Sequence, residues 1–279
     1  MAYTAEISRG NPSCFLFMID QSGSMADPFG AGESNKRKAD GVADAINKLL
    51  QNLVIKCAKA EGVRDYYHVG VIGYGAQVGP ALTGSLAGRE LIPVSEVANA
   101  PARIEERKMK VEDGAGGLVE ESKKIPIWID PTANGGTPMC QAIQHSGSII
   151  QQWLNQHPGC FPPVVINITD GEATDGDPSI PAESLKQLSS SDGAVLLFNA
   201  HCSSQRTTPI LFPDSEEGLP DDYARLLFRM SSHLPEYLRN IAEQEGFKVS
   251  ENTRGFVFNA ELVQVITFLD IGTRPSNLR

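Results

Sequence analysis

The chain has 279 residues and a formal net charge of -10, with 41% hydrophobic and 21% charged residues. This composition is ordinary for a folded globular protein and excludes an intrinsically disordered chain. The acidic balance argues against a general nucleic-acid-binding protein, which needs concentrated Lys and Arg to neutralise phosphates. A divalent cation is a better match for acidic loops.

The cysteines and the N-terminus indicate a cytoplasmic protein. The five cysteines are scattered through the chain, and several lie in apolar or helical stretches, at Cys14, Cys57, Cys140, Cys160 and Cys202. Small buried thiols in a reducing compartment are the expected reading. The start "MAYTAEISRGNPS" lacks the basic and apolar segments of a signal peptide, and we find no stretch long enough to span a membrane.

Five short apolar runs predict the strands of a central parallel sheet. They lie at 14–19, 66–75, 163–169, 193–201 and 254–260. Nearly continuous apolar runs are typical of strands that are covered on both faces.

Helical periodicity fills the gaps between these strands. Apolar residues recur at helical spacing after residue 36 as far as Cys57, with Gly62 as a stop signal. Further helices are expected at about 139–156, 181–190, 234–245 and 260–270. The alternation predicts an α/β fold, a doubly wound and mostly parallel sheet with helices on both faces.

Two stretches are predicted insertions into a single domain spanning 1–279, with its core at about 12–270. Residues 102–130 have charged arms around Asp113-Gly114-Ala115-Gly116-Gly117 and predict a β-ribbon, with a solvated helix and loop as the alternative. We expect Glu105 and Arg107 to face solvent and Ile125, Ile127 and Trp128 to root the ribbon. Residues 203–235 predict a loop and a short helix over the edge of the sheet.

Polar residues at two strand ends form the candidate site. Asp20, Ser22 and Ser24 follow the first strand, and Asp170 ends "VVINITD". Ligands of open parallel sheets bind at the carboxyl ends of the strands. Between them in sequence, "NGGTPM" places Thr137 before Pro138, where we expect it to cap the following helix.

Together these pieces resemble the von Willebrand factor type A (vWA) domain of bacterial type. In that family a metal-ion-dependent adhesion site (MIDAS) has the order D-x-S-x-S, a distant Thr and a distant Asp, which here are Asp20, Ser22, Ser24, Thr137 and Asp170. The resemblance implies a Rossmann-like fold, bound Mg²⁺ or Mn²⁺, and a protein partner that supplies an Asp or Glu to the metal. Oxygen ligands of this kind suit a hard divalent ion.

Two functions follow, and the first is favoured. The chain is expected to be a non-enzymatic, cytoplasmic protein-interaction module without nucleic-acid or membrane partners. The alternative is a metal-dependent phosphoester hydrolase, which lacks a D-x-D pair and an obvious general base. Gly73-Tyr74-Gly75 lacks the third glycine of a dinucleotide fingerprint.

Other polar residues are interpreted as structural. His68 is expected to be a core histidine, and His145 and His157 lie on or after a helix. His201 and Cys202 make no zinc motif without partners at ligand spacing. Glu172, Asp175 and Asp177 are interpreted as a solvated turn. The sequence indicates neither the oligomeric state nor the partner.

Overall fold

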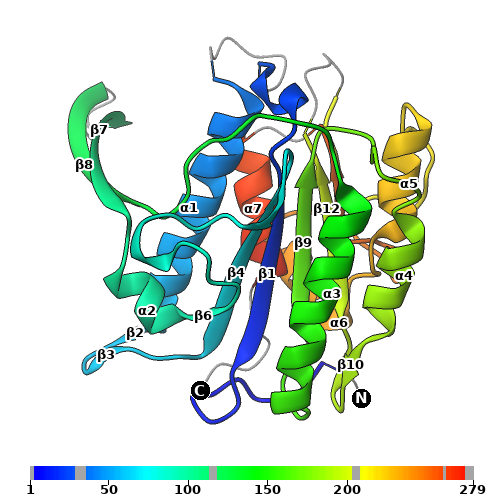
Figure 1. Cartoon of the computed structure of the whole chain (residues 1–279), viewed down its shortest axis with the longest axis horizontal. Coiled ribbons are helices and arrows are strands. Elements are labelled where there is room, and N and C mark those ends of the chain that lie inside the picture. Colours follow the sequence, from blue (N-terminus) through cyan, green and yellow to red (C-terminus); the bar gives the residue numbers. More distant parts are fainter. Residues whose placement is uncertain (1–2, 29–35, 113–117, 203–207, 260–261, 274–279) are drawn as a thin grey trace.

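A twisted sheet runs through the middle of the molecule in the computed structural model (Figure 1). The described residues are 3–28, 36–112, 118–202, 208–259 and 262–273. The parallel strands are β1 (Ser13–Asp20), β4 (Tyr67–Tyr74), β9 (Val164–Thr169), β12 (Leu196–His201) and β14 (Phe256–Phe258). They lie in the order β14-β12-β9-β1-β4, so the predicted parallel core is confirmed.

Short antiparallel strands complete the two edges of the sheet. These are β13 (Ile210–Leu211) beside β14, and β5 (Val78–Pro80) and β6 (Ile92–Pro93) beside β4. Small antiparallel pairs lie outside it, β2 (Ala58–Lys59) with β3 (Gly62–Val63) and β10 (Ser189–Ser190) with β11 (Gly193–Ala194).

Helices cover both faces of the sheet (Figure 1). One layer contains α1 (Lys38–Cys57), α2 (Val94–Asn99), α6 (Glu236–Gln244) and α7 (Leu262–Gly272). The other contains α3 (Met139–Gln156), α4 (Ser179–Gln187) and α5 (Asp222–Met230). Strand β1 contributes side chains to the cores on both faces of the sheet. Phe15 and Phe17 pack toward the first layer, and Leu16 and Met18 toward the second.

The predicted helices are found with shifted ends. The first crossover helix ends at Cys57, before the predicted stop, and Gly62 instead begins β3 directly after the β2–β3 turn, with a φ of 120°. An L side chain rarely adopts that backbone conformation, so glycine marks the turn rather than the helix end. In the 203–235 insertion the predicted short helix is α5, which packs on β12 and β14. None of the described helices has the length and apolarity that a membrane span requires.

The order of strands reverses between β1 and β9. After β1 the chain crosses to β4 on one side, whereas β9, β12 and β14 are added on the other. Asp20 ends β1 and Asp170 directly follows β9, so both acids lie at this switch point. This crevice is where open α/β sheets bind their ligands.

The predicted β-ribbon, hereafter the ribbon, is confirmed as β7 (Arg103–Glu112) paired antiparallel with β8 (Leu118–Ile127). It projects from the body beside α1 (Figure 1). The predicted turn at 114–117 lies outside the described residues. Ile127 and Trp128 are buried at its base as expected, and Ile125 is half-buried.

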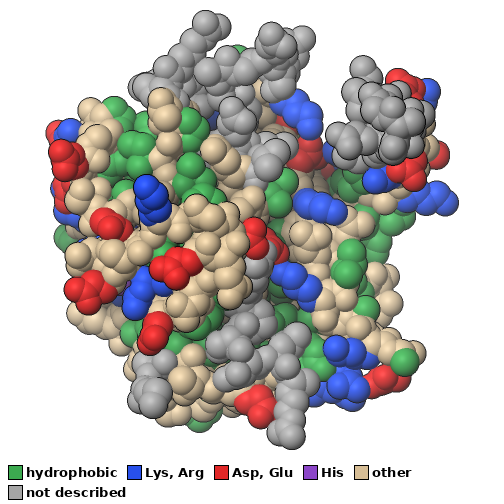
Figure 2. All heavy atoms as spheres, turned by 180° about the vertical axis from the view of Figure 1, so that it is seen from behind, with side chains coloured by type: hydrophobic (Ala, Val, Ile, Leu, Met, Phe, Trp, Pro, Cys, Tyr) green, Lys and Arg blue, Asp and Glu red, His purple; other side chains and the backbone are tan. Residues whose placement is uncertain are grey.

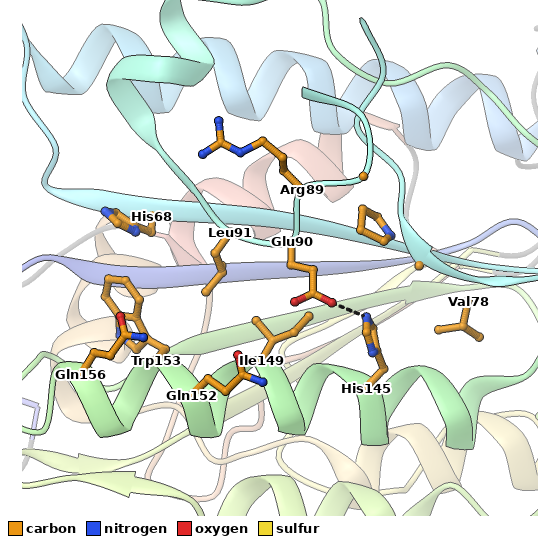
Figure 3. A pocket seen from close by; sticks show the side chains of 13 residues that line it. His68, Val78, Arg89, Glu90, Leu91, His145, Ile149, Gln152, Trp153 and Gln156 are labelled. Carbon is orange, nitrogen blue, oxygen red and sulfur yellow. Dashed lines mark ion pairs between the residues drawn. The ribbon is translucent and has the colours of Figure 1, made fainter. Parts of the chain in front are cut away.

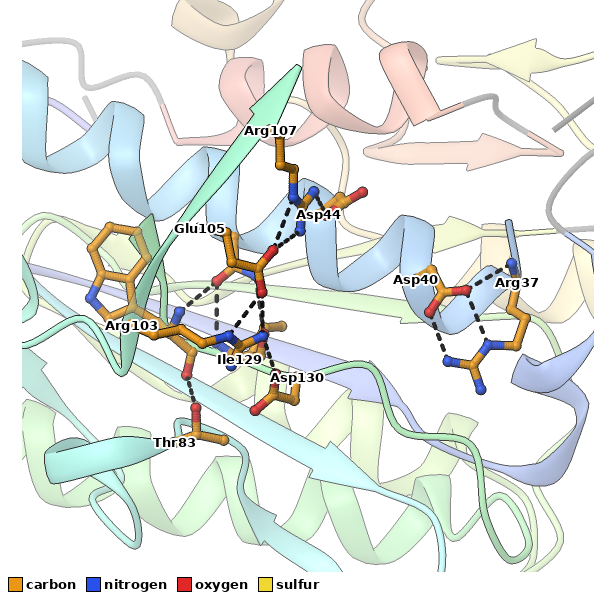
Figure 4. Close-up of polar contacts among 11 residues, drawn as sticks. Arg37, Asp40, Asp44, Thr83, Arg103, Glu105, Arg107, Ile129 and Asp130 are labelled. Atoms are coloured by element: carbon orange, nitrogen blue, oxygen red, sulfur yellow. Dashed lines mark hydrogen bonds and ion pairs between the residues drawn. The ribbon is translucent and has the colours of Figure 1, made fainter. Parts of the chain in front are cut away.

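One prediction about the ribbon is wrong. Glu105 and Arg107 are half-buried rather than directed into solvent, because Arg107 reaches Asp44 on α1 at 2.6 Å and Glu105 at 2.8 Å (Figure 4). The Arg103 guanidinium forms two ion pairs, one with the Glu105 carboxylate at 2.6 Å and one with the Asp130 carboxylate at 2.7 Å. These ion pairs tie the ribbon to the domain.

Candidate functional site

Asp20 is buried at the end of β1, with 2% of its surface exposed. Its Oδ1 accepts a hydrogen bond from the Ser22 amide at 2.8 Å, and its Oδ2 accepts one from the Thr169 hydroxyl at 2.7 Å. Burial raises the pKa of Asp20 to about 6, opposed by hydrogen bonds from the Ser22 side chain, the Thr169 hydroxyl and the Ser22 amide and reinforced by the charge of Asp170. A cation at this position would be favoured electrostatically.

Ser22 and Ser24 flank the start of a short 3₁₀ turn, Gly23–Ala26. Their Oγ atoms are 3.0 Å apart, and Ser24 Oγ donates to Asp170 Oδ1 at 2.8 Å. Both hydroxyls therefore lie between the two strand-end carboxylates.

Lys38 is a component of this cluster that the sequence analysis missed. Its Nζ is 2.7 Å from Asp170 Oδ2 and 3.8 Å from Asp27 Oδ2, and its side chain is 5% exposed. The Asp170 side chain is fully buried. A lysine in the first turn of α1 resembles any solvated charge in sequence, and no periodic signal distinguishes it. Lys38 balances the charge of Asp170.

Thr137 borders the same space. It is 5% exposed, and a Cβ placed on Gly171 would lie 3.7 Å from Thr137 Oγ1 and 3.9 Å from Ser24 Oγ. The Thr137 amide donates to Thr174 Oγ1 at 3.0 Å, and the Thr174 amide donates to the Thr137 carbonyl at 2.9 Å. The loops after β9 and before α3 are thereby joined.

The predicted capping role of Thr137 is wrong. Helix α3 begins at Met139 with Pro138 in the cap position, and no cap-residue side chain bonds to it. The carboxylate of Asp175 accepts instead from the amides of Cys140 at 3.0 Å and Gln141 at 2.9 Å. Asp175 was expected in a solvated turn, but it caps α3 across 35 residues of sequence. A local spacing rule could not find this contact.

Backbone contacts fix the loop that carries Thr137. The Gln21 amide donates to the Tyr74 carbonyl at 2.7 Å, and the Asn134 amide donates to the Gln21 carbonyl at 2.6 Å. Gly135 has a φ of 86°, and a Cβ there would lie 2.4 Å from the Ala76 nitrogen. Only glycine allows this close approach.

The remaining histidines lie away from the cluster or within the core. His201 is 8% exposed, and its ring stacks on Phe258 at a centroid distance of 4.8 Å. Burial lowers the pKa of His201 to about 4. Cys202 and the other cysteines are buried and free, as predicted.

A hollow among the described residues lies away from this cluster. A cleft of about 560 Å³ lies between β4 and α3, lined among others by His68, Glu90, His145 and Trp153 (Figure 3). Glu90 Oε1 and His145 Nε2 face each other across it at 3.1 Å. His68 is half-buried against Trp153 rather than part of a closed core. A small pocket of about 10 Å³ beside Asp20 is lined by residues of α1 and of 129–132, and by none of the other four predicted ligands.

The arrangement offers oxygen ligands for one cation. In the described part of the chain, no three or more His, Cys, Asp and Glu side chains gather as a metal-binding group. Any metal here would therefore rely on two carboxylates and three hydroxyls, the hard oxygen donors that Mg²⁺ and Mn²⁺ prefer.

Comparison with known proteins supports the fold. No protein-family model matches the sequence, and a search of the curated proteins finds no match. Among solved structures, the PilB minor pilin from Streptococcus sanguinis is similar at a TM-score of 0.50 and 10% identity, over 94% of this chain and 61% of that chain.

Two vWA-type structures are also similar, at lower scores. The ArnB paralog VWA2 from Sulfolobus acidocaldarius has a TM-score of 0.35 and 13% identity, over 68% of this chain and 35% of that chain. The vWF domain of the type V pili tip protein Mfa5 from Porphyromonas gingivalis has a TM-score of 0.34 and 13% identity, over 58% of this chain and 39% of that chain. The chain thus spans 35% to 61% of the length of these three structures.

Proposed function

We propose that this chain is a non-enzymatic, cytoplasmic protein-interaction module that docks an acidic side chain of its partner through a divalent cation. The cation, Mg²⁺ or Mn²⁺, would be held by Asp20, Ser22, Ser24, Thr137 and Asp170, as the resemblance to the bacterial vWA family implies. A bound cation would supply one open, electrophilic position for a carboxylate oxygen.

The spacing of the oxygen atoms is the observation that carries this proposal. Adjacent ligands of an octahedral ion with bonds of about 2.1 Å lie about 3 Å apart. The Ser22 and Ser24 hydroxyls are 3.0 Å apart, and Ser24 Oγ is 2.8 Å from Asp170 Oδ1. These groups hydrogen-bond to one another at distances close to those of shared ligands.

The charge of the ligand set favours an anionic partner. Two carboxylates balance a divalent ion, but Lys38 already offsets one of them, since its Nζ is 2.7 Å from Asp170. The three hydroxyls contribute oxygen atoms without charge. A partner carboxylate would therefore meet a site with net positive character, which explains a preference for Asp or Glu.

The test is capture of partners from a lysate of the source organism, with the wild-type protein immobilised in Mg²⁺ or in EDTA. We expect a partner that is retained in Mg²⁺, released by EDTA and absent with Asp20→Ala. Asp130→Ala is the matched control, because Asp130 is 45% exposed and forms an ion pair with Arg103, outside the candidate site. Partners that bind equally in EDTA would refute the metal dependence.

A further inference from the structure

The outer edge of β8 is unpaired in the described structure. Among the described residues, strand β8 pairs with β7 alone. The register runs from Arg103 opposite Ile127 to Glu112 opposite Leu118. The residues at its middle, 120–124, are all exposed. An exposed strand edge presents a row of free N–H and C=O groups that can pair with another strand.

The charges along this edge have a two-fold pattern. Residues 120–124 read Glu120, Glu121, Ser122, Lys123, Lys124. In an antiparallel pair of identical strands with Ser122 opposite Ser122, Glu120 faces Lys124 and Glu121 faces Lys123. Each pair occurs twice, which gives four pairs of opposite charge. Opposed residues share the same face of the sheet, so the charges of each pair can meet.

We propose that β8 is a homodimerisation strand, which pairs antiparallel with β8 of a second copy of this chain and joins two ribbons into one four-stranded sheet. The two-fold axis passes beside Ser122. Such an interface is isologous, with the same surface contributed by both copies.

The charged side chains of β8 form only long, solvent-exposed contacts in the described structure. The Lys108–Glu120 contact is 3.6 Å, with side chains 78% and 61% exposed, and the Lys123–Glu121 contact is 3.4 Å, with side chains 48% and 55% exposed. Long contacts between exposed charges contribute little stability. Exchange of these contacts for cross-strand pairs therefore costs little. Figure 2 shows side chains of both signs around the ribbon at the upper right.

The β7 edge is a poorer candidate. It carries Glu105, Glu106, Arg107 and Lys108. An antiparallel copy of this strand could also place each glutamate opposite a basic residue. Two of these are already engaged, because Arg107 contacts Asp44 at 2.6 Å and Glu105 contacts Arg103 at 2.6 Å (Figure 4). Pairing through β7 would break the contacts that hold the ribbon to the domain.

The charge order also selects one orientation. Charges on edge strands usually prevent association. A parallel copy in register would place glutamate opposite glutamate and lysine opposite lysine, which is unfavourable, whereas the antiparallel copy matches every charge. Pro126 lacks an amide hydrogen and would end the new ladder near the base of the ribbon. An isolated two-stranded ribbon is marginally stable, and four strands are more stable than two.

Analytical ultracentrifugation of the full chain tests this proposal. We expect a concentration-dependent dimer of the wild type that weakens at high salt. The variants Glu120→Lys/Glu121→Lys and Lys123→Glu/Lys124→Glu should each raise the dimer dissociation constant at least tenfold. Mixed in equal amounts, they should form a heterodimer, because an all-lysine strand then faces an all-glutamate strand.

A matched control separates this effect from net charge. Glu217→Lys/Glu251→Lys changes the charge as Glu120→Lys/Glu121→Lys does, at exposed positions outside the ribbon. Both lessen the repulsion between two copies of a chain with a net charge of -10. The control should therefore dimerise at least as well as the wild type, whereas the ribbon variant should not.

Cross-linking gives a second readout that does not depend on charge. All five native cysteines are buried, so Ser122→Cys introduces the one exposed thiol among the described residues. Mild oxidation should link two copies of Ser122→Cys but not of Ser148→Cys, a control on the exposed face of α3. A monomeric wild type, a dimer unaffected by both charge variants, or equal cross-linking of both cysteine variants would overturn the proposal.

Discussion

Lys38 is the residue that most affects how the candidate site would bind an ion. Its ammonium group lies 2.7 Å from Asp170 Oδ2, in a largely buried position. Like charges repel strongly where water is excluded. Lys38 should therefore lower the affinity of the site for any divalent cation.

We expect Lys38→Met to bind Mn²⁺ about tenfold more tightly than the wild type, equivalent to about 1.4 kcal/mol. Calorimetric titration measures this directly. Lys36→Met is the matched control, since Lys36 is 52% exposed and pairs with Asp44 instead. Equal affinities for wild type and Lys38→Met would show that Lys38 does not oppose the ion.

His201 should make the protein less stable in mild acid. Its folded-state pKa is about 4 because of burial, whereas an unfolded histidine titrates near 6.5. As the pH falls from 7 to 5, the unfolded chain gains a proton that the folded chain does not, so stability falls by about 2 kcal/mol at pH 5. This loss should be absent in His201→Gln.

Denaturant unfolding at pH 7 and pH 5 measures the effect. Asp20 acts in the opposite direction, because its raised pKa makes the folded state bind a proton more readily as the pH falls below 6. The comparison is therefore between wild type and His201→Gln, in which Asp20 is common to both. An identical pH dependence for the two would contradict the prediction.

At the scale of elements, the start of α3 separates two roles that one residue was expected to combine. Asp175 caps the helix, whereas Thr137 faces the cluster. Asp175→Ala should lower the free energy of unfolding by about 1 kcal/mol. Thr137→Ala should cost less stability but abolish Mg²⁺-dependent partner binding. Thermal unfolding and partner capture on the same two variants distinguish the roles, and the reverse result would restore Thr137 as the cap.

A buried amide on α1 helps to hold the base of the ribbon. Asn47 Oδ1 accepts from the Trp128 amide at 2.8 Å and the Ile129 amide at 3.1 Å, and Asn47 Nδ2 donates to the Ile129 carbonyl at 3.1 Å. Asn47→Ala leaves these buried groups unpaired and should destabilise the protein by about 2–3 kcal/mol. Urea unfolding measures the change, with Lys48→Ala as an exposed neighbour for comparison.

The sequence predicted elements better than it predicted contacts between them. Continuous apolar runs are a strong signal, which is why the strands β1 and β9 were predicted. The ribbon was predicted from its glycine-rich centre and charged arms. Lys38, Asp175 and the ion pairs of Arg107 were missed because each depends on residues distant in sequence. The residues around a lysine or aspartate in sequence do not indicate which distant residue it will contact.

At the scale of the whole molecule, a doubly wound sheet brings two loops together at one edge. Asp20 and Asp170 are 150 residues apart in sequence, yet Ser22 and Ser24 together connect them through hydrogen bonds. The candidate site and the ribbon lie on different elements, so the proposed partner and the second copy would bind separate surfaces. A dimer formed through β8 would carry two metal sites.

The most direct test of the central claim is calorimetric titration of the purified chain with Mn²⁺. We predict one site in the wild type, no measurable binding by Asp20→Ala, and wild-type binding by Asp130→Ala. Circular dichroism verifies that Asp20→Ala is folded. If folded Asp20→Ala binds Mn²⁺ with wild-type affinity, or if the wild type binds none, the cluster at the ends of β1 and β9 is not a metal site.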